Sequence, residues 1–153
     1  MSSLSEFIKQ SWLFPVIQSI HIIGLTMLVG TITMVDLRLL GIGLRRQTIR
    51  DLASRVAPWT FAGLLTVLIT GPLLFWADLT RYLNNPAFVV KMGLLAVALA
   101  AHFTIHRSAI ENLSGHLQAA PVKQKLTAAL SLVLWSSVVL AGRAIADFDI
   151  RVT

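Results

Sequence analysis

Hydrophobic residues gather into four long runs, and polar segments separate these runs. The runs cover roughly Phe14 to Val35, Ala57 to Ala77, Phe88 to Ile105 and Leu126 to Ala146. Each run is close to the ~20 residues that an α-helix needs to cross the ~30 Å hydrocarbon core of a bilayer. The runs are too long, and alternate too little in polarity, to be β-strands. The pattern therefore predicts four membrane-spanning helices, of which the first can continue to Leu44.

Prolines indicate where these helices are expected to begin. Pro15 suits the first turn of the first predicted helix, and Pro58 and Pro86 suit the starts of the second and third. The two asparagines directly before Pro86 supply turn chemistry. Pro72 lies inside the second run, where it is expected to kink the helix, as membrane helices tolerate.

The segment Leu4 to Leu13 places apolar residues at helical spacing with charged and polar residues between them. This pattern is typical of a short helix lying in the membrane interface. We do not expect a cleaved signal peptide, because the first hydrophobic run is too long and no small-residue cleavage site follows it. The predicted fold class is all-α: an integral membrane four-helix bundle with a short N-terminal interfacial helix, in a single domain, residues 1–153.

The composition agrees with a membrane protein. The chain is 56% hydrophobic and only 13% charged, whereas soluble domains carry about 25% charged residues. It has no cysteine, which excludes disulfides, zinc–thiolate sites, iron–sulfur clusters and thioether-attached haem. The net charge of +6 lies mostly in loops rather than in a water-facing basic stripe. We therefore expect a lipid bilayer as the surroundings and no nucleic-acid partner.

The loop charges predict the orientation of the chain. Eight basic residues belong to the first and third loops: Arg38, Arg45, Arg46, Arg50, Arg55, Arg107, Lys123 and Lys125. Five belong to the opposite side: Lys9, Arg81, Lys91, Arg143 and Arg151. Loops rich in lysine and arginine stay in the cytoplasm. This bias predicts a protein of the cytoplasmic (inner) membrane with both termini outside, in the periplasm.

Ionisable residues within the hydrophobic runs are the candidate functional residues, because they are costly in lipid. The first and third helices are expected to run in the same direction. Fifteen positions separate His21 from Asp36 in the first helix and Lys91 from His106 in the third. Counted from the proline near the start of each helix, His21 lies level with Lys91, and Asp36 lies level with His106.

Two polar clusters follow from these depths. The outer cluster contains Gln18, His21, Lys91 and Arg143, and the inner cluster contains Asp36, Arg38, His102 and His106. We expect Asp36 and His106 to form an ionic or hydrogen-bonded pair between helices, since a lone carboxylate in a low dielectric is neutralised. The alternative is that Asp36 is hydrated at the interface.

Each cluster also has a purely structural interpretation. Lys91, Arg143 and Arg38 can extend to lipid headgroups, and His21 and His102 can hydrogen-bond across helices. Three residues on one side of the second helix suit close helix packing: Gly63, Thr66 and Thr70. Trp135 lies in the middle of the fourth run, where it either packs or contacts a cofactor.

Four stretches of the chain resemble a family of uncharacterised bacterial four-helix inner-membrane proteins. They are HIIGLTMLVGTITMVDLRLLG from His21, WTFAGLLTVLITGPLLF from Trp59, NPAFVVKMGLLAVALAAHFTIHR from Asn85 and WSSVVLAGRAIA from Trp135. The resemblance implies the four-span fold and the inner-membrane location, but no activity. A more distant likeness is to copper-resistance membrane domains and small b-type cytochromes, whose helices carry a histidine followed by glycine and small residues.

One hypothesis is a membrane subunit that binds haem b and carries electrons within or to a larger complex. His21 would be the axial metal ligand, with Lys91 and Arg143 near the propionates. His102 lies eleven residues beyond Lys91, or ~16 Å deeper at 1.5 Å per residue, so one haem cannot use both histidines. A sixth ligand would come from a partner subunit, a water molecule or a displaced helix.

Two other hypotheses stay open. A proton- or ion-transfer subunit would use Asp36, His102 and His106, and would need an oligomer because four helices leave little room for a cavity. Copper suits this chain poorly, because it has no cysteine and only Met27, Met34 and Met92 within the predicted helices. A cofactor-free structural or accessory subunit would use its polar residues for packing against other membrane subunits or a second copy. No catalytic motif is present, so whether the chain is an enzyme stays open.

Overall fold

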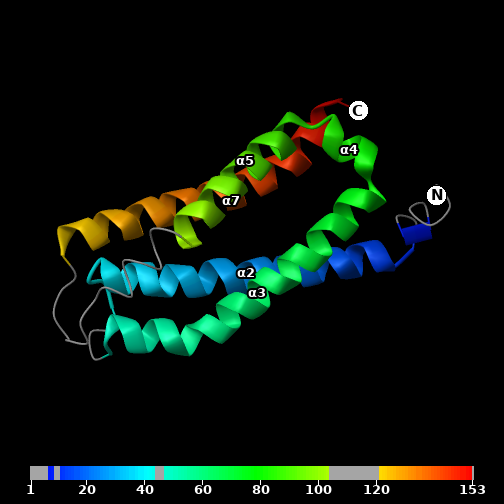
Figure 1. Cartoon of the computed structure of the whole chain (residues 1–153). Helices are drawn as coiled ribbons and strands as arrows, with labels where there is room; N and C mark the ends of the chain where they lie inside the picture. The colour runs from blue at the N-terminus through cyan, green and yellow to red at the C-terminus, as the bar shows by residue number, and fades with distance from the viewer. Residues whose placement is uncertain (1–6, 9–10, 44–46, 104–120, 153) are drawn as a thin grey trace.

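The computed structural model describes residues 7–8, 11–43, 47–103 and 121–152, and every regular element among them is helical. The helices are α2 (Leu13–Leu39), α3 (Ile49–Ala77), α4 (Leu79–Leu83), α5 (Pro86–Ala101) and α7 (Val122–Val152). They form two helix pairs: α2 packs along α3, and α5 packs along α7 (Figure 1). Contacts between α2 and α7 join the pairs. We call the end of the bundle where α2 and α5 begin the α4 end.

The described helices are those of a membrane protein. Three segments are long and apolar enough to cross a bilayer: α2, α3 and Val122–Ile145 of α7. The fourth apolar helix, α5, has 16 residues, or ~24 Å at 1.5 Å per residue, which is less than the ~30 Å core. His102 and Phe103 continue it as a wider π-type turn. The predicted all-α fold is therefore confirmed for the described residues, with three helices of spanning length rather than four.

The second predicted helix begins earlier than its hydrophobic run. The Thr48 side chain accepts a hydrogen bond from the Asp51 N–H at 3.0 Å and so caps α3 at Ile49. Pro58 therefore lies inside α3, and the prediction that it starts the helix is wrong. Hydrophobicity marks where the chain enters lipid, whereas the N-cap determines where the helix begins.

The first predicted helix ends before Leu44. Gly41 has φ +85°, a left-handed conformation that glycine adopts without strain. The Gly41 N–H donates to the Arg38 carbonyl at 3.1 Å, and the Ile42 N–H donates to the Leu37 carbonyl at 2.8 Å. These two bonds form a Schellman motif, which ends α2 at Leu39.

Other predicted helix boundaries agree with the structure. Pro86 is the first residue of α5, and the Asn85 side chain caps the helix by accepting from the Ala87 N–H at 3.0 Å. Pro15 lies in the first turn of α2, and Pro72 lies inside α3 as predicted. Of the predicted interfacial helix, Phe7 and Ile8 are helical, and much of the remainder lies outside the described residues.

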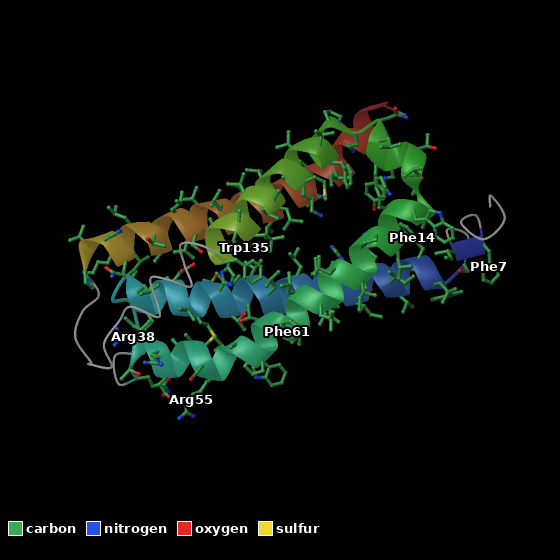
Figure 2. All side chains as sticks on the ribbon, viewed as in Figure 1. Phe7, Phe14, Arg38, Arg55, Phe61 and Trp135 are labelled. Atoms are coloured by element: carbon green, nitrogen blue, oxygen red, sulfur yellow. The ribbon has the colours of Figure 1, made fainter. Side chains whose placement is uncertain are left out.

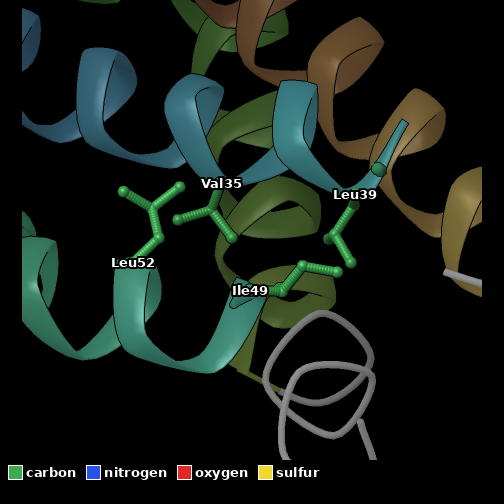
Figure 3. Packing of buried hydrophobic residues seen from close by; sticks show 5 residues of the cluster. Val35, Leu39, Ile49 and Leu52 are labelled. Atoms are coloured by element: carbon green, nitrogen blue, oxygen red, sulfur yellow. The ribbon is translucent and has the colours of Figure 1, made fainter. Parts of the chain in front are cut away.

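Two buried hydrophobic clusters hold the helix pairs together. The first joins α2, α3 and α7 through Val35, Leu39, Ile49, Leu52 and Ala128 (Figure 3). The second joins α2, α5 and α7 through Leu28, Ile32, Ala98, Trp135 and Val138. Trp135 is only 2% exposed and packs between the helix pairs, whereas Phe61 lies on the outside of α3 (Figure 2). Large apolar side chains on that outer surface suit contact with lipid.

Candidate functional site

The candidate site lies between α2 and α3, on the α4 side of the point where the two helices cross with almost no side chain between them. A Cβ atom added to Gly63 would lie 2.7 Å from the Gly24 carbonyl oxygen and 2.7 Å from the Leu28 nitrogen. Only glycine at position 63 allows the two backbones to approach so closely. The crossing brings His21, one turn before Gly24, against Thr70 of α3. Gly63 and Thr70 thus lie in a close helix contact, as predicted, and the helix that they contact is α2.

A chain of hydrogen bonds orients the His21 imidazole. Nδ1 of His21 lies 2.7 Å from Oγ1 of Thr70. The Thr70 hydroxyl in turn donates to the Thr66 carbonyl oxygen at 2.6 Å. A hydroxyl has one proton and a carbonyl can only accept, so the proton between His21 and Thr70 belongs to Nδ1. In the neutral imidazole, Nε2 is then the nitrogen with a lone pair, and it makes no hydrogen bond within the described residues.

Lys91 belongs to α5, in the other helix pair from His21. Its ammonium is close enough for its charge to act on the imidazole. It also lies beside α7, since a Cβ atom added to Gly142 would be 3.6 Å from Nζ of Lys91. Arg143 follows Gly142 and has an exposed side chain. The structure therefore places Lys91 beside Gly142 of α7 and within electrostatic range of His21, and Arg143 is the residue after Gly142.

A second glycine leaves space beside His21. A Cβ atom added to Gly71 of α3 would lie 3.5 Å from Cε1, the imidazole carbon between the two nitrogens. Sequence reasoning assigned Thr70 to packing alone and overlooked Gly71 and Gly142. The available signal was the GP pair at Gly71 and Pro72, an unusual sequence inside a membrane helix.

The inner polar residues lie apart from this site. Asp36 is fully buried, at 0% exposure, which disfavours the alternative of a hydrated carboxylate. Arg38 is 3% exposed, and its Nε donates to the Gln47 carbonyl at 3.0 Å, so it does not extend to headgroups. His106 lies outside the described residues, and its pairing with Asp36 stays a prediction.

His102 is too deep in the bundle to share a ligand with His21. Its ring lies edge-on to Trp135, with centroids 6.5 Å apart. Trp135 packs in the cluster with Leu28 and Ile32. Leu28 and Ile32 follow His21 in α2 by seven and eleven positions, or ~10–16 Å along the helix. Among the described residues, no three His, Cys, Asp or Glu side chains form a metal-binding group.

Comparison with known families places the chain in one of them. Residues 12–148 match DUF6644, a family of unknown function, and the chain belongs to that family. This agrees with the resemblance to an uncharacterised family. No curated protein and no solved structure matches the chain.

Proposed function

We propose that this membrane protein is a subunit that binds haem b through Nε2 of His21 and carries electrons within a larger membrane complex. The observation that supports this proposal best is the hydrogen bond from Nδ1 of His21 to Thr70. Metal-ligating histidines almost always donate their other ring N–H to a fixed acceptor, which sets the tautomer and orients the ring. His21 has such an acceptor inside the bundle.

The surroundings of His21 suit an anionic, flat macrocycle. Lys91 and Arg143 supply the cationic groups that propionates need. Gly71 and Gly142 present no side chain toward His21 and Lys91 respectively. Haem would supply one-electron chemistry, and the protein would tune it through the axial ligand, its hydrogen bond and the nearby charges. Since His102 lies too deep, the sixth ligand would be a water molecule or a residue of another subunit.

We further propose that the chain spans the inner membrane four times with both termini in the periplasm. The support is the apolar α5, which His102 and Phe103 lengthen, and the eight-to-five excess of basic residues in the first and third loops. Reporter fusions after Arg50 and Gln118 are expected to score as cytoplasmic. A periplasmic signal from either fusion would contradict the proposed orientation.

An absorption spectrum tests the haem proposal directly. The protein purified from haem-replete cells is expected to show a Soret band and, after dithionite reduction, an α band. Replacing His21 with Ala is expected to abolish both bands while the protein still inserts. His102→Ala is the matched control and should retain the bands, because His102 lies at another depth. A wild-type protein that shows no absorbance even after haemin is added would refute the proposal.

The second candidate is a cofactor-free accessory subunit. One observation favours it: the α2–α3 contact also contains a hydrogen bond from the Thr60 hydroxyl to that of Thr31 at 2.8 Å, far from His21. Polar side chains in this pair therefore do serve packing. This candidate predicts a colourless protein that co-purifies with a stable partner, and the same spectrum separates it from the haem proposal.

A further inference from the structure

We propose that Thr70 and Gly71 are positioning residues that select Nε2 of His21 as the ligating nitrogen and keep the space beside it open. This inference rests on the proposed haem function. It concerns two neighbouring residues of α3 that do not themselves contact iron. Thr70 acts through its hydroxyl, and Gly71 acts through the absence of a side chain.

Thr70 is a rigid acceptor. Its side chain is 7% exposed, and its hydroxyl proton is engaged by the Thr66 carbonyl at 2.6 Å. The hydroxyl therefore cannot rotate to donate to His21 without losing that bond. His21 meets a fixed lone pair and places its proton on Nδ1. Replacing Thr70 with Val keeps the shape of the side chain but removes the acceptor, so the imidazole is free to exchange tautomers and rotate.

Gly71 lies beside Cε1 of His21, the imidazole carbon that is bonded to both Nδ1 and Nε2. A methyl group there would make an ordinary van der Waals contact, 3.5 Å from Cε1 of His21. A single methyl therefore fits, and Gly71→Ala is expected to be tolerated. A branched side chain would have to occupy the space beside the ring, so Gly71→Leu is expected to block the approach of a macrocycle to Nε2.

The experiment compares Thr70→Val, Thr70→Ser and a matched control, Thr60→Val. The control removes the other threonine hydrogen bond between α2 and α3, at a distance from His21. Two readouts are used in detergent: ¹⁵N NMR of the imidazole in haem-free protein, and titration with haemin followed by redox titration of the bound haem. Folding of each variant is checked by circular dichroism.

For Thr70→Val we expect a mixture of imidazole tautomers, a haem dissociation constant raised ~10-fold or more, and a shifted midpoint potential. Thr70→Ser is expected to restore all three properties, and Thr60→Val is expected to leave them unchanged. If Thr70→Val fails to fold, Gly71→Leu provides the second test. This variant keeps the hydrogen bonds of the Thr70 hydroxyl, so it should keep the Nδ1–H tautomer of His21 and still lose haem affinity.

The outcomes separate this inference from the proposed function. If wild-type protein binds haem and Thr70→Val matches Thr60→Val in tautomer, affinity and potential, the role of Thr70 is refuted and the haem function stands. If wild-type protein binds no haem, the proposed function is refuted, and the role in ligation falls with it. Haem affinity unchanged in Gly71→Leu would refute the role of Gly71.

Discussion

The α2–α3 crossing makes a strong prediction about one residue, Gly63. Replacing it with Ala adds a single methyl group in the middle of the contact. That methyl carbon would lie 2.7 Å from the Gly24 carbonyl oxygen and 2.7 Å from the Leu28 nitrogen. Both are backbone atoms, so neither can rotate away as a side chain would. The two helices have to separate.

The size of the effect follows from the distances. Reaching an ordinary contact of 3.4 Å from 2.7 Å requires a shift of 0.7 Å, by subtraction. A rigid shift would stretch the His21–Thr70 and Thr31–Thr60 hydrogen bonds from 2.7 and 2.8 Å toward the limit of useful geometry. Overpacking costs about 1–3 kcal/mol, and each interhelical bond in a membrane contributes ~0.6 kcal/mol. Gly63→Ala is therefore expected to destabilise the fold by about 2–4 kcal/mol.

The assay is reversible unfolding in mixed micelles, followed by circular dichroism as the SDS fraction increases. Gly30→Ala is the matched control, because an added Cβ on this residue of α2 meets nothing within 4 Å. Gly24→Ala should behave like Gly63→Ala, because its Cβ would lie 2.8 Å from Cβ of Thr66. If Gly63→Ala unfolds at the same SDS fraction as Gly30→Ala, the close crossing of α2 and α3 does not exist.

Two further substitutions test the packing of α5 and α7. Asn85 is buried, caps α5 by accepting from the Ala87 N–H, and donates to the Ile145 carbonyl at 3.0 Å. Asn85→Ala should therefore lower the free energy of unfolding by about 1–2 kcal/mol. Asn85→Asp keeps the cap but loses the donor, so a thermal midpoint equal to wild type would contradict the contact with α7. Trp135→Ala should cost about 3–5 kcal/mol, whereas Trp59→Ala, at a residue 61% exposed, should cost far less; equal losses would contradict the burial of Trp135.

Hydrophobic patterning was sufficient to predict the helices but not their ends. Lipid requires long apolar stretches, so the runs in the sequence mark the helices well. The start of α3 depends on Thr48, a polar residue before the run, and could not be found from hydrophobicity. The end of α2 shortly before Gly41 was predictable, because glycine after a helix commonly adopts the left-handed conformation that stops it.

The depth of the candidate residues could be estimated from the sequence, but their partners across the bundle could not. Helices rise by a constant 1.5 Å per residue, so counting from Pro15 and Pro86 predicts that His21 lies level with Lys91. The partner of Nδ1 could not be found by counting. It depends on which face of α3 meets α2, and the glycine crossing decides that in three dimensions.

Packing alone does not account for both nitrogens of His21. The hydrogen bond to Thr70 uses Nδ1 only, and a threonine would serve helix packing equally well, as Thr31 does with Thr60. Histidine adds a second nitrogen, and in this structure the charge of Lys91 acts on that ring from the other helix pair. A lysine that served only lipid headgroups would have no reason to lie beside Gly142 of α7. A haem bound between Nε2 and the cationic groups would contact both His21 and Lys91. We therefore prefer the haem proposal to a purely structural subunit.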